Sequence, residues 1–185
     1  MNNTGNITRN YFNYTIELNL NQQYFWRVMV NDSLNVSPWS NIWNFTVQPY
    51  VAVSLLTANV NFGTIFQYVT QDTTDGIPNP LRLQNDGNTE CNVSVSARSL
   101  WKSIPLNRKY YRFKAREALE LNGFNLTHSQ MTWENMSSGN RSAIKKFYHT
   151  DSHDEEYIDI QVEVPPYEAP GLRNSTIIIY SEEGT

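Results

Sequence analysis

The sequence contains a single cysteine, Cys91, so no disulfide can form within the chain. Charged residues make up only 17% of the 185 residues, and no cluster of lysine and arginine is present. Because proteins that bind nucleic acid neutralise several phosphates with such clusters, we expect no nucleic-acid partner. The longest apolar runs, at 51–56 and 177–180, are far too short to span a bilayer as helices.

Recognisable catalytic motifs are also missing. The chain has no Gly-x-Ser-x-Gly, phosphate-binding loop, Cys-x-x-Cys or His-x-x-x-His pattern. The segment 151–156 places acidic residues beside His153, with His149 nearby, and such a group could hold a metal or transfer protons. A solvated loop ahead of the next strand is the simpler interpretation. We therefore expect no catalysis, no metal and no cofactor.

Asparagine is abundant and is often followed by serine or threonine two positions later. At this composition chance would give about four such glycosylation triplets, and the sequence has eleven. They begin at Asn2, Asn6, Asn13, Asn31, Asn35, Asn44, Asn92, Asn125, Asn135, Asn140 and Asn174. Glycans on such sites mark extracellular surfaces, although an AT-rich genome could also raise the asparagine content. An extracellular protein without disulfides is typical of prokaryotic, including archaeal, surfaces.

Residues 11–47 contain three short runs in which apolar and polar residues alternate. The runs cover residues 14–18, 24–30 and 43–47, and turn-forming residues separate them. A period of two places one side of a strand in a core and leaves the other side in water. The stretch therefore predicts strands of an antiparallel β-sandwich.

Leu18 lies six residues before Tyr24, and Trp26 belongs to the sequence Tyr-Phe-Trp-Arg-Val that begins there. Ser-Pro-Trp-Ser follows at 37–40 and Trp-Asn-Phe-Thr-Val at 43–47. In this pattern the stretch resembles the later half of a fibronectin type III domain. The resemblance implies that the Tyr24 hydroxyl bonds to upstream backbone while its ring is buried. A complete domain has about 100 residues, so the resemblance implies a truncated module over residues 1–48.

Residues 49–185 predict a second and larger module, reached through a short linker at 48–50. Strand candidates lie at 51–56, 60–65, 81–84, 91–97, 110–114, 143–148, 157–164 and 175–180. Short strands separated by frequent turns are typical of an Ig-like sandwich. Residues 51–183 also resemble β-sandwich modules of archaeal cell-surface proteins, through Val-Asn-Phe-Gly, Asp-Thr-Thr-Asp, Asn-Asp-Gly-Asn and Asn-Val-Ser-Val.

Three local patterns lead to more detailed expectations in this module. Residues 81–84 and 91–97, joined through Asn-Asp-Gly-Asn, predict a β-hairpin. Residues 113–121 have helical propensity and predict one or two helical turns. In the strand at 157–164, the alternating acidic and polar residues are expected to face water.

Oxygen-bearing side chains on two turns are candidate calcium ligands. Asp72 and Asp75 belong to Asp-x-x-Asp-Gly, and Asp86 lies in a second turn. Calcium prefers six or more oxygen ligands. The ligand spacing of an EF-hand is absent, however, and Asp-Gly is common in ordinary turns. Cys91 alternates with valines, which predicts an inert core thiol.

Aromatic residues are numerous, with 5 tryptophans and 11 tyrosines, and their rings could stack on sugars. We expect instead that Tyr24 and Trp26 lie in a core and that Trp39 and Trp43 close its end. The other positions that would bind sugar if exposed are Tyr110, Tyr111 and Trp133.

The sequence as a whole predicts a non-catalytic, structural or adhesive part of a glycosylated extracellular or cell-surface protein. Its expected partners are other surface proteins or glycans, and its expected fold is all-β with antiparallel sandwich modules. Two alternatives stay open: a carbohydrate-binding accessory module of an extracellular enzyme, and a filament subunit assembled by strand donation. In the last case the missing strands of the first module would drive self-association.

Overall fold

The computed structural model describes residues 18–32, 34–118 and 122–184, and within these ranges the chain is all-β. Two compact units are present, residues 1–49 and 50–185, and their boundary lies within the linker expected from the sequence. The strands are β1 (Gln23–Trp26), β2 (Trp43–Thr46), β3 (Val53–Thr57), β4 (Thr70–Asp72), β5 (Leu81–Asn85), β6 (Cys91–Ala97), β7 (Tyr111–Glu117), β8 (Glu134–Asn135), β9 (Arg141–Phe147), β10 (Glu155–Glu163) and β11 (Ile177–Glu183). The pairings between these strands are antiparallel, which confirms the predicted fold class.

In the first unit, β1 and β2 form a two-stranded antiparallel hairpin. Beyond β1 the hairpin is held by serine hydroxyls, because Ser40 accepts the Val28 N–H and Ser37 accepts the Val30 N–H. At the tip, the Asp32 carboxylate accepts two backbone N–H groups of the turn. Of the strand predicted at 14–18, only Leu18 is among the described residues.

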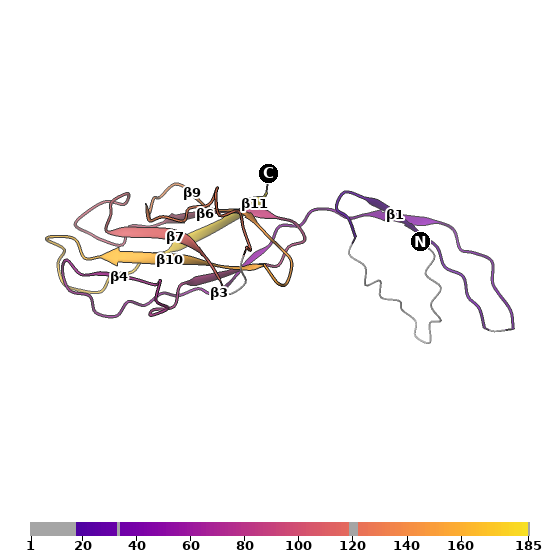
Figure 1. The fold of residues 1–185 in the computed structure, drawn as a ribbon, viewed down its shortest axis with the longest axis horizontal. Coiled ribbons are helices and arrows are strands. Elements are labelled where there is room, and N and C mark those ends of the chain that lie inside the picture. Colours follow the sequence, from indigo (N-terminus) through magenta and orange to yellow (C-terminus); the bar gives the residue numbers. More distant parts are fainter. Residues whose placement is uncertain (1–17, 33, 119–121, 185) are drawn as a thin grey trace. The chain divides into compact units, whose positions relative to one another are not determined.

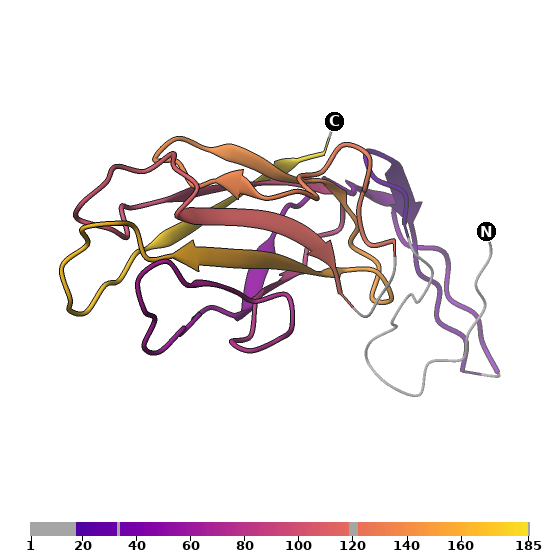
Figure 2. The same cartoon turned by 60° about the vertical axis from the view of Figure 1, so that its left-hand side comes forward.

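The second unit is a sandwich of two sheets (Figures 1 and 2). One sheet has the order β3-β5-β10-β7-β8. β4 also pairs with β10, at residues 161–163, beyond the part of β10 that pairs with β5. The other sheet has the order β11-β6-β9. Strands far apart in the sequence therefore lie side by side, such as β7 and β10, which pair over seven positions.

The core lies between the two sheets and follows the alternation of the sequence. In β10, Ile158, Ile160 and Val162 point into it and are buried. The facing sheet contributes Val93 and Ile144, and both are fully buried. Continuous burial of this kind is the main source of stability in a sandwich.

The polar residues of β10 do not face water, contrary to the sequence prediction. Asp159 is fully buried and Gln161 nearly so. Arg116 on β7 donates two hydrogen bonds to the Asp159 carboxylate, at 2.7 and 3.0 Å, and the Thr73 hydroxyl donates a third at 2.9 Å. Neighbouring strands thus supply partners on the same face, so these polar groups are buried without losing their hydrogen bonds.

The predicted hairpin over residues 81–97 is wrong. β5 belongs to one sheet and β6 to the other, so the connection crosses between the layers. Asn85 is buried at this crossing, and its amide donates hydrogen bonds to the carbonyls of Thr89 and Phe147. Asp-Gly turns and alternating runs are shared by hairpins and crossings, so the pattern alone could not separate them.

The connection between β5 and β6 also fixes the backbone where the second unit begins. Asn88 accepts the Tyr50 N–H through its side chain, at 2.7 Å, and donates its own N–H to the Tyr50 carbonyl, at 3.0 Å. A Cβ atom added to Gly87 would lie 2.4 Å from that carbonyl oxygen. Glycine is therefore required here by close packing of two backbones.

Two further expectations are corrected. The helical turns predicted at 113–121 are absent from the described part of that segment, because residues 113–117 belong to β7. Residues 60–65 form no strand, and Val60, Phe62 and Ile65 instead pack as a loop against the core. In both cases tertiary packing overrides the local propensity.

Candidate functional site

Two cross-strand aromatic pairs form a partly exposed apolar surface on the hairpin. Tyr24 stacks on Phe45 with ring centroids 5.7 Å apart, and Trp26 packs against Trp43 at 4.7 Å. The pairing register places all four rings on one side of the hairpin, which we call the aromatic face. Trp26 is 49% exposed, Trp43 45% and Phe45 44%.

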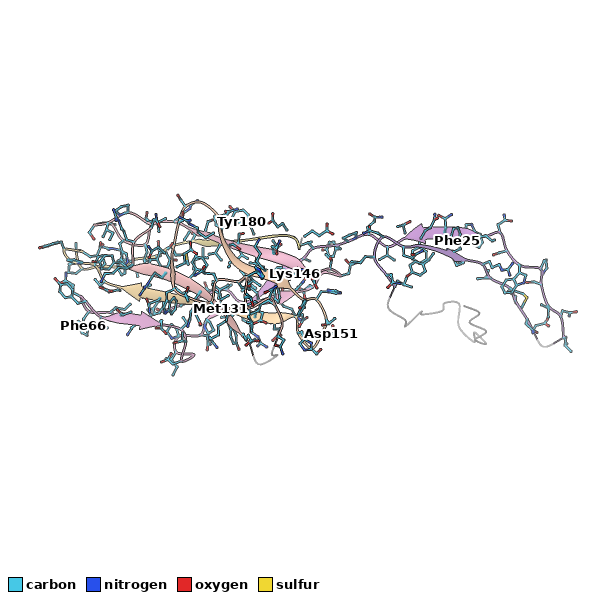
Figure 3. All side chains as sticks on the ribbon, turned by 45° about the horizontal axis from the view of Figure 1, so that its top comes forward. Phe25, Phe66, Met131, Lys146, Asp151 and Tyr180 are labelled. Carbon is cyan, nitrogen blue, oxygen red and sulfur yellow. The ribbon has the colours of Figure 1, made fainter. Side chains whose placement is uncertain are left out.

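The opposite side of the two strands is mostly polar. It carries Gln23, Phe25, Asn44 and Thr46, and the Gln23 amide donates to the Asn44 side-chain oxygen at 3.0 Å. Asn44 is exposed and begins a glycosylation triplet. Phe25, which is labelled in Figure 3, is the one apolar residue of the strands on this side according to the pairing register. The triplet at Asn44 and the aromatic face thus lie on opposite sides of the hairpin.

The expectation that Trp26 lies in a core is wrong. Burial of Trp26 would require a second sheet over the aromatic face, but Trp26 is half exposed. Trp39 is also half exposed and closes no core; the Arg27 guanidinium lies 4.2 Å above its ring. Alternation correctly identifies the apolar side of these strands but does not show whether another layer covers it.

Tyr24 makes the backbone contact that the resemblance implies. Its hydroxyl accepts the Asn19 N–H at 2.7 Å, and its ring and Leu18 are partly buried. The bond ties the chain five residues upstream to the start of β1. A single turn of this kind does not define a family, so the fibronectin type III assignment stays a prediction.

The glycosylation triplets differ in accessibility. The acceptors Asn31, Asn35, Asn44, Asn140 and Asn174 are exposed. Asn125 and Asn135 are partly buried, and Asn2, Asn6 and Asn13 lie outside the described residues. Asn92 on β6 is only 4% exposed, and its side-chain oxygen accepts the Lys146 N–H. A glycan at Asn92 is incompatible with this fold.

Two of the three candidate calcium ligands line one open cavity of about 570 Å³ in the second unit. Asp72 and Asp75 contribute to it, whereas Asp86 lies in the connection between β5 and β6 and is not part of its lining. The Asp72 carboxylate accepts hydrogen bonds from the backbone and hydroxyl of Thr74 and from Gln161. Burial alone would raise the pKa of Asp72, but these hydrogen bonds outweigh it and lower the pKa.

Only the first part of the segment 151–156 is the solvated loop expected from the sequence: Asp151 and Ser152 are exposed in a turn, whereas Asp154 and Glu156 are buried. Asp154 accepts a hydrogen bond from Gln84, Glu155 pairs with Arg82, and Glu156 is fully buried and accepts the Ala118 N–H. The acids therefore point to different partners. Within the described ranges, no three histidine, cysteine or acidic side chains are placed to hold one metal ion.

Cys91 is fully buried in β6, and burial raises the pKa of its thiol to about 12. Such a thiol is neither ionised nor accessible at neutral pH. Among the other aromatic candidates, Tyr111 is buried, and Trp133 is partly buried with Lys114 4.8 Å above its ring. Tyr110 is also partly buried, so these three residues form no exposed row.

Comparison with protein-family models, curated proteins and solved structures gives no match for this chain. In the part of the chain that the structure describes, no helix has the length and apolar character needed to cross a membrane. The structural class of the protein is defined by its fold and its surfaces. It is an all-β antiparallel sandwich protein with an exposed aromatic hairpin.

Proposed function

We propose that this chain is a non-catalytic structural or adhesive part of a glycosylated extracellular or cell-surface protein. The observation that supports this proposal best is the aromatic face, with an exposed glycosylation acceptor on the opposite side of the same strands. A glycan on Asn44 would keep one side of the hairpin in water. The aromatic face would then be the side available for contact with another protein.

The size of the aromatic face supports a role in contact. About half of three large aromatic side chains is exposed, on the order of 300 Å² in total. At about 25 cal/mol per Å², covering this area would contribute several kcal/mol. The largest apolar patch on a typical soluble monomer is of this size, about 300–600 Å², and is often functional.

The partner that we propose for this face is a second copy of the chain. Two copies of one face can meet across a twofold axis, so that each aromatic pair covers the pair of the other copy. The hairpin, which has no second layer among the residues that the structure describes, would thereby gain one. Self-association through the aromatic face is thus the form of the adhesive function that can be tested directly.

Sedimentation of the whole chain with Trp26→Ser and Trp43→Ser together tests this proposal. We expect the unchanged chain to associate as its concentration rises, and the double variant to stay monomeric. Phe25→Ser is the matched control, because Phe25 lies on the opposite side of β1 and is more exposed than Trp26. If Phe25→Ser reduces association as strongly as the double variant, the aromatic face is not the contact surface.

Two alternatives are each favoured by a feature of the hairpin, its aromatic face or its strand edges. A carbohydrate-binding accessory module of an extracellular enzyme would use Trp26 and Trp43 as a platform for sugar rings. A filament subunit would accept a strand from its neighbour along the outer edge of β1 or β2, each of which pairs only with the other strand within the described ranges. Binding of polysaccharide by monomers would favour the first alternative, and long polymers in electron micrographs would favour the second.

A further inference from the structure

The open cavity of about 570 Å³ in the second unit is built from two loops. One loop contributes residues 61–63, and the other contributes residues 70–78, which include β4. The volume lies within the range of small-ligand sites, and six of the ten lining residues are exposed, so a ligand here would lie in an open groove. This cavity belongs to a different unit from the aromatic face, so the inference goes beyond the proposed contact function and does not depend on it.

An oriented carboxylate lies in the wall of the cavity. Asp72 accepts the Thr74 N–H at 2.9 Å and the Gln161 amide at 3.3 Å, besides the Thr74 hydroxyl. These donors hold both oxygens in place and favour the ionised form. Asp72 therefore offers a fixed acceptor whose orientation does not have to be set when a ligand binds.

Asp75 and Asn61 complement Asp72. One oxygen of Asp75 accepts the Ile77 N–H at 2.9 Å, and within the described residues its second oxygen receives no hydrogen bond. The Asn61 side-chain oxygen accepts the Gly63 N–H at 2.9 Å, and its NH₂ group is a further potential donor. The wall thus presents both acceptors and a donor, and a hydroxyl group needs both because it donates and accepts.

The same wall also contains apolar surface. Phe62, Ile77 and Pro78 line the cavity beside the polar groups. A sugar ring has an apolar C–H face and a rim of hydroxyls, so it can use both kinds of lining at once. The two carboxylates make the cavity negative, which disfavours sugars that carry acidic groups.

A calcium ion suits this lining less well than a sugar. Calcium requires six to eight oxygen ligands, and the cavity offers two carboxylates. The third candidate, Asp86, is not part of the wall. The described residues also bring no three metal-ligating side chains together here.

We infer that the cavity between residues 61–63 and 70–78 binds a neutral carbohydrate. Asp72 and Asp75 accept hydrogen bonds from its hydroxyls, Asn61 donates to one of its oxygens, and Phe62 packs against the ring. The ligand is a short glycan without acidic groups, such as a glucose or mannose oligosaccharide.

Titration of the whole ¹⁵N-labelled chain with glucose and mannose trisaccharides, followed by NMR, tests this inference. We expect saturable shifts of the backbone amides of residues 61–63 and 70–78 with at least one of the two sugars. Asp75→Asn and Asn61→Ala should each weaken binding about five- to tenfold, because each removes or weakens one hydrogen bond. Asp86→Asn is the matched control and should bind as the unchanged chain does.

Three results would overturn the inference. The first is the absence of saturable shifts with both sugars while the spectrum shows a folded chain. The second is equal binding by the Asp75 and Asn61 variants and the unchanged chain, which would place the sugar elsewhere. The third is shifts of the same amides with calcium chloride alone. A failure of hairpin-mediated association would leave these shifts unchanged, so the two proposals fail separately.

Discussion

The two units use aromatic residues on similar alternating strands in opposite ways. In the sandwich, Phe113 and Phe147 are fully buried because the second sheet faces them. In the hairpin, Trp26 and Trp43 lie on a side of comparable apolar character and remain about half exposed. The strand pattern therefore specifies which side is apolar, whereas the presence of a second layer decides whether that side becomes a core or a surface.

Among the changes considered, removal of a buried ring from the sandwich should lower the free energy of unfolding the most. Phe113→Ala deletes a fully buried side chain and should lower the free energy of unfolding by about 3–5 kcal/mol. Phe45→Ala removes a ring from the hairpin that is 44% exposed and should cost far less. Denaturant unfolding of both variants, followed by circular dichroism, measures the difference. Equal losses would mean that the hairpin has a core of its own.

The close packing around Gly87 tests the start of the sandwich. Gly87→Ala would place Cβ 2.4 Å from the Tyr50 carbonyl oxygen, so the backbone must move. We expect a loss of about 1–3 kcal/mol of unfolding free energy, as for other overpacked sites. Gly139→Ala is the control, because the nearest atom to its added Cβ is 3.8 Å away. Thermal unfolding of both variants should show a clear decrease for Gly87→Ala alone.

Glu168 gives the sandwich a defined acid sensitivity. Burial would raise its pKa, but hydrogen bonds from Ser103, Arg173 and Lys102 outweigh burial and lower it from 4.5 to about 2. A lowered folded-state pKa adds stability above the unfolded value, and this stability is lost as pH falls from about 4.5 toward about 2.

The unfolding free energy measured across this pH window should therefore fall less steeply in Glu168→Gln than in the unchanged chain. Glu182→Gln, an exposed acid on β11, is the comparison variant. If Glu168→Gln and the unchanged chain have the same pH dependence, Glu168 does not carry the acid sensitivity.

Glycan mapping by mass spectrometry compares exposed and buried asparagines. It requires no substitution and therefore no change in stability. In the chain purified from its native source, we expect modification at exposed acceptors such as Asn44, Asn140 and Asn174. Asn92 should be unmodified because it is 4% exposed and its side chain bonds to the β9 backbone. A glycan found on Asn92 would contradict the described position of β6.

Sequence patterns predicted where the strands lie better than they predicted which strands pair. The alternation around Ile158 and Ile160 correctly located β10, and the valines beside Cys91 correctly located β6. Which strands pair depends on contacts across the whole fold, so the crossing at Asn85 looked like a hairpin turn. The burial of Asp159 could not be predicted either, because its partner Arg116 lies 43 positions away in the sequence.

The candidate sites were predictable only in part. Asp72 and Asp75 stood out as turn residues, and the structure places both in one cavity, but no pattern linked them to Asn61 and Phe62. In the hairpin, the aromatic residues were evident from the sequence, whereas the exposure of Trp26 was not. Exposure depends on what lies opposite a strand, and that information is not contained in the strand itself.

The most direct test of the central claim compares the whole chain with a chain that begins at Tyr50, by sedimentation over a wide range of concentrations. Our account predicts that the whole chain associates as concentration rises, through the aromatic face of its hairpin. The shorter chain, which retains the compact second unit, should remain a folded monomer. If both chains are monomers at every concentration, the aromatic face does not mediate self-association, and the proposed contact function is contradicted.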